Sequence, residues 1–204
     1  MKDNFIEFYV NKFNYLKSAE PIDISFLSPI IRRRLSKLDK GVISLLEKTI
    51  CENTQNIVFS SQTGELERLL KIIEQYTTEK EVSPNTFSGS VHNYPVGFFL
   101  LNNKKSIPYN AISAGDNSIS AGITAAVISK YNNVLFCYCD IYEETLYAFA
   151  ISINKKDHNG KKYRFSIKNN NINSNFDDYI ELFSEKKDIL ISDIFTIERI
   201  TKNV

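Results

Sequence analysis

Between residues 30 and 153, helical patterns of apolar residues alternate with short apolar strands, and this order restricts the chain to few folds. The predicted elements, in order, are strand 3–10, helix 30–48, strand 56–60, helix 64–76, helix 96–101, strand 109–113, helix 115–129, strand 134–139 and strand 145–153. Alternating helices and strands predict an α/β fold with a mixed sheet whose faces are covered by helices.

A length of 204 residues suits one ordinary domain, which we place at 1–153. The remaining residues, 154–204, are rich in Asn and Lys and form a polar extension. They predict a strand at 163–167, a short helix at 176–183 and a closing strand at 189–200. We expect this extension to pack on the same domain.

Charge and cysteine content exclude several classes of protein. Lys and Arg number 25 against 24 Asp and Glu, so the net charge of +1 predicts no wide electrostatic surface for nucleic acid or anionic membrane. Cys137 and Cys139 share one face of a strand and are interpreted as small core residues, with a metal or redox pair as the alternative. No signal peptide or membrane span is visible, which predicts a cytoplasmic protein. No paired-cysteine zinc pattern and no Rossmann or phosphate-binding motif is visible either, so no metal or cofactor is expected.

Two segments could bind anions or partners. Arg32, Arg33 and Arg34 stand at the start of the predicted helix 30–48, where they could hold a phosphate or a carboxylate, although a solvated surface is the simpler interpretation. After strand 56–60 the chain enters the next helix with Glu65 in its first turn. A site at the strand end and an ordinary helix cap both remain open for Glu65.

Two further segments carry nucleophiles or bases. Ser90, His92 and Asn93 lie in 83–97, where His92 needs a nucleophile or metal companions to act chemically. A structural His–Asn pair is the alternative. Residues 112–122 form a strand-to-helix turn that offers Ser113 and Ser118 without a nearby histidine.

Taken together, these motifs resemble the small β-ketoacyl synthase N-terminal-domain proteins of the thiolase-like fold, a group that includes chain length factors of aryl polyene clusters. The resemblance spans about 25–144 and rests on segments 27–36, 59–68, 83–93, 114–122 and 134–140. It implies the N-terminal half of a ketosynthase, with a mixed, mainly parallel central sheet and helices on both faces.

The resemblance also implies where a catalytic cysteine would stand. The corresponding turn falls near Ala114 and Gly115 and holds no cysteine, so no catalytic residue is assigned. The two histidines that a complete ketosynthase carries in its C-terminal half have no counterpart after residue 153, as expected from the length. Phe98, Phe99 and Ile119 become candidates for a partner interface or an acyl tunnel, with a plain core role equally open.

The resemblance favours a non-catalytic, chain length factor-like subunit that pairs with a complete ketosynthase in type II polyketide or fatty-acid-like biosynthesis. Acyl carrier protein is a second expected partner, and a homodimer is left open for the isolated chain. One alternative is an acyl-thioester transferase or hydrolase that uses Ser113 or Ser118 with His92. Another is a homodimeric scaffold that binds carrier protein through Arg32, Arg33 and Arg34.

Overall fold

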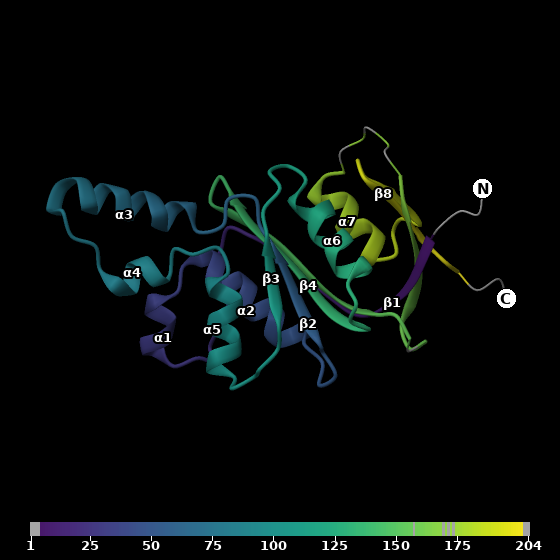
Figure 1. Ribbon diagram of the computed structural model, residues 1–204, viewed down its shortest axis with the longest axis horizontal. Helices are drawn as coiled ribbons and strands as arrows, with labels where there is room; N and C mark the ends of the chain where they lie inside the picture. Colours follow the sequence, from purple (N-terminus) through teal and green to yellow (C-terminus); the bar gives the residue numbers. More distant parts are fainter. Residues whose placement is uncertain (1–4, 157, 169, 171, 173, 202–204) are drawn as a thin grey trace.

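One central sheet organises the computed structural model, which describes residues 5–156, 158–168, 170, 172 and 174–201 (Figure 1). The strands lie in the order β3-β2-β4-β5-β1-β6-β8-β7. Their bounds are β1 (Phe5–Ser18), β2 (Asn56–Ser60), β3 (Tyr109–Ile112), β4 (Asn133–Tyr142), β5 (Thr145–Asn154), β6 (Lys161–Ile167), β7 (Ile189–Ile191) and β8 (Phe195–Arg199). The mixed α/β class is confirmed.

The sheet is more antiparallel than predicted. Parallel pairing joins β2 to β3 and to β4, whereas the other five neighbouring pairs are antiparallel. The reason is local, because β4 and β5 form a hairpin, and strands joined by a short turn run in opposite directions. Glu143 and Glu144 make that turn with φ of 46° and 66°, so the hairpin predicted from sequence is confirmed.

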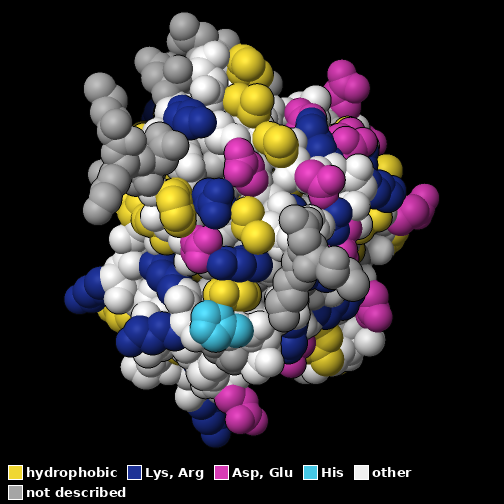
Figure 2. Space-filling model, turned by 90° about the vertical axis from the view of Figure 1, so that its right-hand side faces the viewer, with side chains coloured by type: hydrophobic (Ala, Val, Ile, Leu, Met, Phe, Trp, Pro, Cys, Tyr) yellow, Lys and Arg dark blue, Asp and Glu magenta, His cyan; other side chains and the backbone are white. Residues whose placement is uncertain are grey.

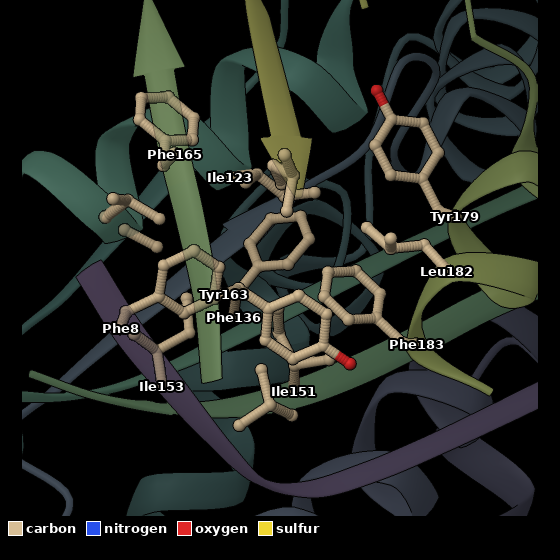
Figure 3. Packing of buried hydrophobic residues seen from close by; sticks show 14 of the residues in the cluster. Phe8, Ile123, Phe136, Ile151, Ile153, Tyr163, Phe165, Tyr179, Leu182 and Phe183 are labelled. Carbon is tan, nitrogen blue, oxygen red and sulfur yellow. The ribbon is translucent and has the colours of Figure 1, made fainter. Parts of the chain in front are cut away.

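Helices cover both faces of the sheet, as predicted. On one face α2 (Lys37–Thr49) and α5 (Tyr94–Asn102) pack over Phe59, Cys137 and Cys139. On the other face α6 (Ser118–Ile128) and α7 (Phe176–Phe183) pack over Phe136 and Phe149, in the aromatic-rich cluster of Figure 3. Burial of this much aromatic and aliphatic surface is the main source of stability.

The described part of the predicted polar extension completes the sheet. Strand β6 pairs with β1 and β8, and β7 forms the outer edge. The predicted closing strand is divided into β7 and β8, because the segment turns back on itself between them. Tyr179, Leu182 and Phe183 of α7 lie in the same core as α6.

The helix predicted over 30–48 is interrupted at Leu35 and Ser36, between α1 (Pro29–Arg34) and α2. Ser36 accepts a hydrogen bond from the Asp39 backbone N–H, and the Asp39 carboxylate accepts one from the Ser36 N–H. This capping box starts a new helix at Lys37. The arginine run therefore lies in the last turn of α1 and not at a helix start.

Helix α3 (Leu66–Glu79) projects from the body of the molecule with α4 (Pro84–Ser88) beneath it (Figure 1). Ile72 is buried, but five side chains of the helix's apolar face are 44–56% exposed: Leu66, Leu69, Leu70, Ile73 and Tyr76. We call these five residues the α3 stripe. Their helical spacing predicts α3 correctly, but the described residues of this chain do not cover the stripe.

Candidate functional site

The turn between β3 and α6 presents Gly115 in a left-handed conformation, with φ of 56°. The Ser118 hydroxyl donates to the Gly115 carbonyl at 2.7 Å and accepts from the Ala114 N–H at 3.0 Å, which fixes the turn. A Cβ atom added to Gly115 would meet no other atom within 4 Å. The turn therefore has room for a side chain at the position where the sequence supplies none, and positive φ favours glycine there.

Asp140, at the end of β4, holds the loop that follows β2. Its fully buried carboxylate accepts hydrogen bonds from the Ser61 hydroxyl (2.8 Å), the Gln62 N–H (2.6 Å), and the N–H (3.0 Å) and hydroxyl (2.9 Å) of Thr63. Four donors satisfy a buried carboxylate and hold the 61–63 segment in place.

Gln62 joins this loop to its neighbours. Its side-chain amide donates to Asp116 at 2.9 Å, and its side-chain oxygen accepts from the Tyr142 hydroxyl at 2.5 Å. The Ser113 hydroxyl donates to the Gln62 carbonyl at 3.0 Å. The carboxyl ends of β2, β3 and β4 thus meet in one hydrogen-bonded set of loops, the place where α/β sheets carry sites.

His92 lies beside this edge of the sheet. Its ring packs against Phe59 with the centroids 5.4 Å apart, and a Cβ on Gly64 would lie 2.7 Å from its Nδ1. Burial lowers the pKa of His92, while the Ile112 carbonyl and Asp140 act in the opposite direction. Its Nε2 is buried and has no hydrogen-bond partner among the residues that the structure describes.

The two serines of the turn are not joined to His92. Within the described chain their hydroxyls donate to the carbonyls of Gln62 (Ser113) and Gly115 (Ser118). Asn93 donates from its side chain to the Tyr109 hydroxyl at 3.3 Å, and Ser90 donates to the Phe87 carbonyl at 2.8 Å. The geometry does not assemble a nucleophile–base pair from these residues.

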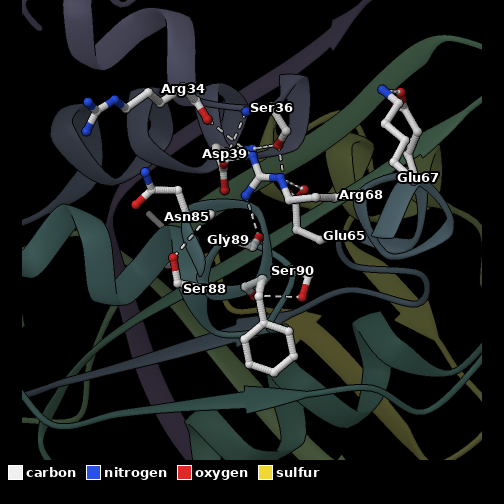
Figure 4. A network of polar contacts seen from close by, with 12 residues as sticks. Arg34, Ser36, Asp39, Glu65, Glu67, Arg68, Asn85, Ser88, Gly89 and Ser90 are labelled. Atoms are coloured by element: carbon white, nitrogen blue, oxygen red, sulfur yellow. Dashed lines mark hydrogen bonds and ion pairs between the residues drawn. The ribbon is translucent and has the colours of Figure 1, made fainter. Parts of the chain in front are cut away.

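Glu65 belongs to a second, buried network at the base of α3 (Figure 4). The Ser36 hydroxyl donates to Glu65 at 2.5 Å, and Arg68 lies 3.4 Å from Glu65 and 2.9 Å from Asp39. Arg68 also donates to the Gly89 carbonyl. One guanidinium therefore faces two buried carboxylates and links α2, α3 and the α4–α5 loop.

Burial and the neighbouring Asp39 raise the pKa of Glu65 to about 7, and burial also raises the pKa of Asp39. Because the folded pKa of Glu65 exceeds its unfolded value, the folded chain binds a proton that the unfolded chain has released. Stability from this group is full below about pH 4.5 and is lost as the pH rises through about 7.

Glu65→Gln is expected to remove this pH dependence, since the amide keeps an acceptor for Ser36 and carries no charge. The unfolding free energy of the natural chain relative to the variant should fall by about 3 kcal/mol between pH 4.5 and 8. Urea unfolding at several pH values measures it. A difference that stays constant, or grows with pH, contradicts a raised pKa.

The three candidate arginines, all in the last turn of α1, do not share one cavity. Arg32 and Arg33 line a cavity of about 450 Å³ with Asp23 and Lys40, whereas Arg34 lines a different cavity. Among described residues, none of Arg32, Arg33 and Arg34 forms an ion pair. The three guanidinium groups therefore do not act as one anion clasp.

The three apolar candidates, Phe98, Phe99 and Ile119, differ in how far their side chains are buried. Phe99 is 1% exposed and Ile119 is 8% exposed, and both pack in the core, on opposite faces of the sheet. Phe98 is half-buried beside Tyr94, with ring centroids 5.9 Å apart. The core role left open from sequence fits Phe99 and Ile119, whereas Phe98 lines a cavity.

Neither thiol of β4 is available for chemistry. Cys137 and Cys139 are fully buried, and burial raises the pKa of both thiols, so the thiolate is disfavoured. Both face the α2 side of the sheet, as the alternation predicted.

A cavity of about 520 Å³ lies at the other end of the sheet and is lined by Tyr9, His158, Lys162, Glu185 and Arg199, among others. Figure 2 shows basic and acidic side chains intermingled on this end of the molecule. Arg199 pairs with Glu185 and Asp188, Lys162 pairs with Glu7, and His158 contacts the Tyr9 hydroxyl. The charged side chains around this cavity are thus neutralised by ion pairs within the chain.

Sequence reasoning missed Gln62, Arg68 and Asp140. A signal for Asp140 existed, because it is the first polar residue after the apolar strand 134–139 and strand ends carry polar sites. For Arg68 the local signal was Glu65 three residues earlier, but its other carboxylate partner, Asp39, lies 29 residues away in the sequence.

Comparison with known proteins agrees with this geometry. Residues 10–171 match the family described as β-ketoacyl synthase, N-terminal domain, so the match continues past residue 153. One similar structure is a chain of the complex of ketosynthase ApeO with its chain length factor ApeC from Xenorhabdus doucetiae. The TM-score is 0.71 and the sequence identity 18%, and the match covers 95% of this chain and 100% of that chain.

A second similar structure is a chain of the type II polyketide synthase complex AntDE:AntF, in which an acyl-carrier protein is bound to its ketosynthase. The TM-score is 0.61 and the identity 11%, and 90% of this chain and 76% of that chain are covered. Among curated proteins no sequence matches this chain. The family match spans most of the sequence and the fold agrees with it: the chain belongs to the β-ketoacyl synthase N-terminal domain family.

Proposed function

We propose that the chain is a chain length factor-like subunit, which binds a complete ketosynthase and leaves acyl condensation to that partner. The observation that carries the proposal is Gly115 at the strand-to-helix turn. The resemblance places the ketosynthase nucleophile at this turn, and covalent acyl transfer requires a thiolate or an activated hydroxyl. In this chain the residue at the turn is Gly115, whose backbone is left-handed and which has neither a thiol nor a hydroxyl group.

The free edge of β3 supports the binding of a partner. Strand β3 pairs with β2 on one side and forms the end of the sheet on the other. Its pattern is not that of a buried strand, since Asn110 and Ala111 are exposed. Unpaired edge groups accept an additional strand, and proteins otherwise protect such edges.

The α3 stripe supports the same proposal. Five large side chains along one face of a projecting helix form an apolar surface that is unusual for a monomer. The occupant we propose is the ketosynthase subunit, because a chain of a ketosynthase–chain length factor complex has this fold over the whole of its length. The helix and the free β3 edge would both be covered in such a heterodimer.

Co-expression with the ketosynthase of the same gene cluster is expected to give a stable heterodimer on size-exclusion chromatography at micromolar concentration. The activity of the ketosynthase should depend on this chain. The proposal is contradicted if the two proteins elute separately and the ketosynthase is equally active with and without this chain. An aryl polyene pathway is the biosynthetic setting we propose, and product analysis of the reconstituted pair tests it.

A further inference from the structure

A cavity of about 300 Å³ lies between α1, α4 and α5, away from the turn that holds Gly115. Residues from all three helices line it, together with Arg68 from α3. Its volume is at the small end of the range for ligand pockets and suits a molecule of few heavy atoms.

Four polar side chains that line the cavity make no side-chain hydrogen bond to the described part of the chain: Arg34 and Asn85, which are exposed, and Thr86 and Tyr94, which are half-buried. The guanidinium of Arg34 and the amide of Asn85 lie on the same side of the buried network in Figure 4. Arg68, in contrast, is engaged by Asp39, Glu65 and the Gly89 carbonyl. Arg34 is exposed and forms no ion pair among the described residues, so its guanidinium is the cation of the cavity that is open to a ligand.

The remaining walls are apolar. Ile31 and Phe98 are half-buried, and the Phe98 ring packs against that of Tyr94 at an interplanar angle of 37°. A cavity that combines one free cation, amide and hydroxyl groups, and aliphatic and aromatic walls is built for a molecule with one charged end.

We propose that this cavity binds a small carboxylate that bears a short apolar chain. The planar guanidinium of Arg34 matches a carboxylate, Asn85 and Thr86 donate to the same group, and the chain lies against Ile31 and Phe98. One guanidinium that is outside any ion pair matches one negative charge, which favours a carboxylate over a phosphate dianion.

Sodium hexanoate is a suitable probe, titrated into the isolated chain and followed by NMR of backbone amides or by calorimetry. We expect saturable binding, with shifts confined to α1, α4 and α5. Arg34→Gln should weaken it about tenfold or more, because a charge-assisted contact is lost. Arg33→Gln is the matched control, since it removes the same charge from the neighbouring residue, which lines a different cavity.

Acetate and hexanamide test separately whether the apolar chain and the negative charge of the ligand contribute to binding. Each should bind about tenfold more weakly than hexanoate, acetate because it lacks the apolar chain and hexanamide because it lacks the charge. Absence of saturable binding overturns the proposal. So does an equal loss in Arg34→Gln and Arg33→Gln, or binding of acetate or hexanamide as tight as that of hexanoate. None of these outcomes depends on heterodimer formation.

Discussion

Ile73→Asp is expected to weaken binding of the ketosynthase by about 100-fold or more, while the isolated chain keeps its fold. Ile73 lies in the middle of the α3 stripe and is 51% exposed, so the free chain tolerates a charge there. In a heterodimer the same side chain would be buried among apolar groups, where an unpaired carboxylate costs several kcal/mol. The dissociation constant, measured by calorimetry with purified subunits, gives the effect.

Thr78→Asp is the control for this experiment, because it adds the same charge to an exposed position of the same helix. The two positions are five residues apart in the sequence, which places them roughly 140° apart around the helix. Binding within about threefold of the natural chain is expected for Thr78→Asp. If both variants bind as tightly as the natural chain, the α3 stripe is not the partner surface.

The sequence was most informative where a local pattern decides the structure. Helix α7 matches its predicted bounds of 176–183, and the β4–β5 hairpin follows from two apolar strands and a short polar turn. The break between α1 and α2 was missed, because apolar residues keep helical spacing across Leu35 and Ser36. The capping bonds of Ser36 and Asp39 outweigh that periodicity.

The α3 stripe shows a different limit of sequence reasoning. Amphipathic spacing identifies which face of a helix is apolar, but not what covers that face. The candidate site has the same limit. The resemblance to ketosynthases pointed to Gly115, whereas Asp140 and Arg68 act on loops and helices far along the chain. Their partners become neighbours only after the sheet has formed.

Arg68→Met is expected to lower the unfolding free energy by about 3 kcal/mol or more at pH 8. The substitution keeps much of the aliphatic volume but leaves Asp39 and Glu65 buried without their shared cation. Removing one partner of a buried ion pair typically costs 3–5 kcal/mol, because the remaining charge stays desolvated. Urea unfolding measures the loss, and Arg33→Met, at an exposed position without an ion pair among described residues, should change stability by less than about 0.5 kcal/mol.

The pH dependence of this loss distinguishes charge from packing. Without Arg68 the pKa values of Asp39 and Glu65 should rise further, so lowering the pH protonates both and the deficit shrinks towards pH 5. Adding Glu65→Gln to Arg68→Met should recover part of the stability at pH 8, since one uncompensated charge is removed. A deficit that is equal at pH 5 and pH 8 and unaffected by Glu65→Gln would assign the role of Arg68 to packing against Tyr94 instead.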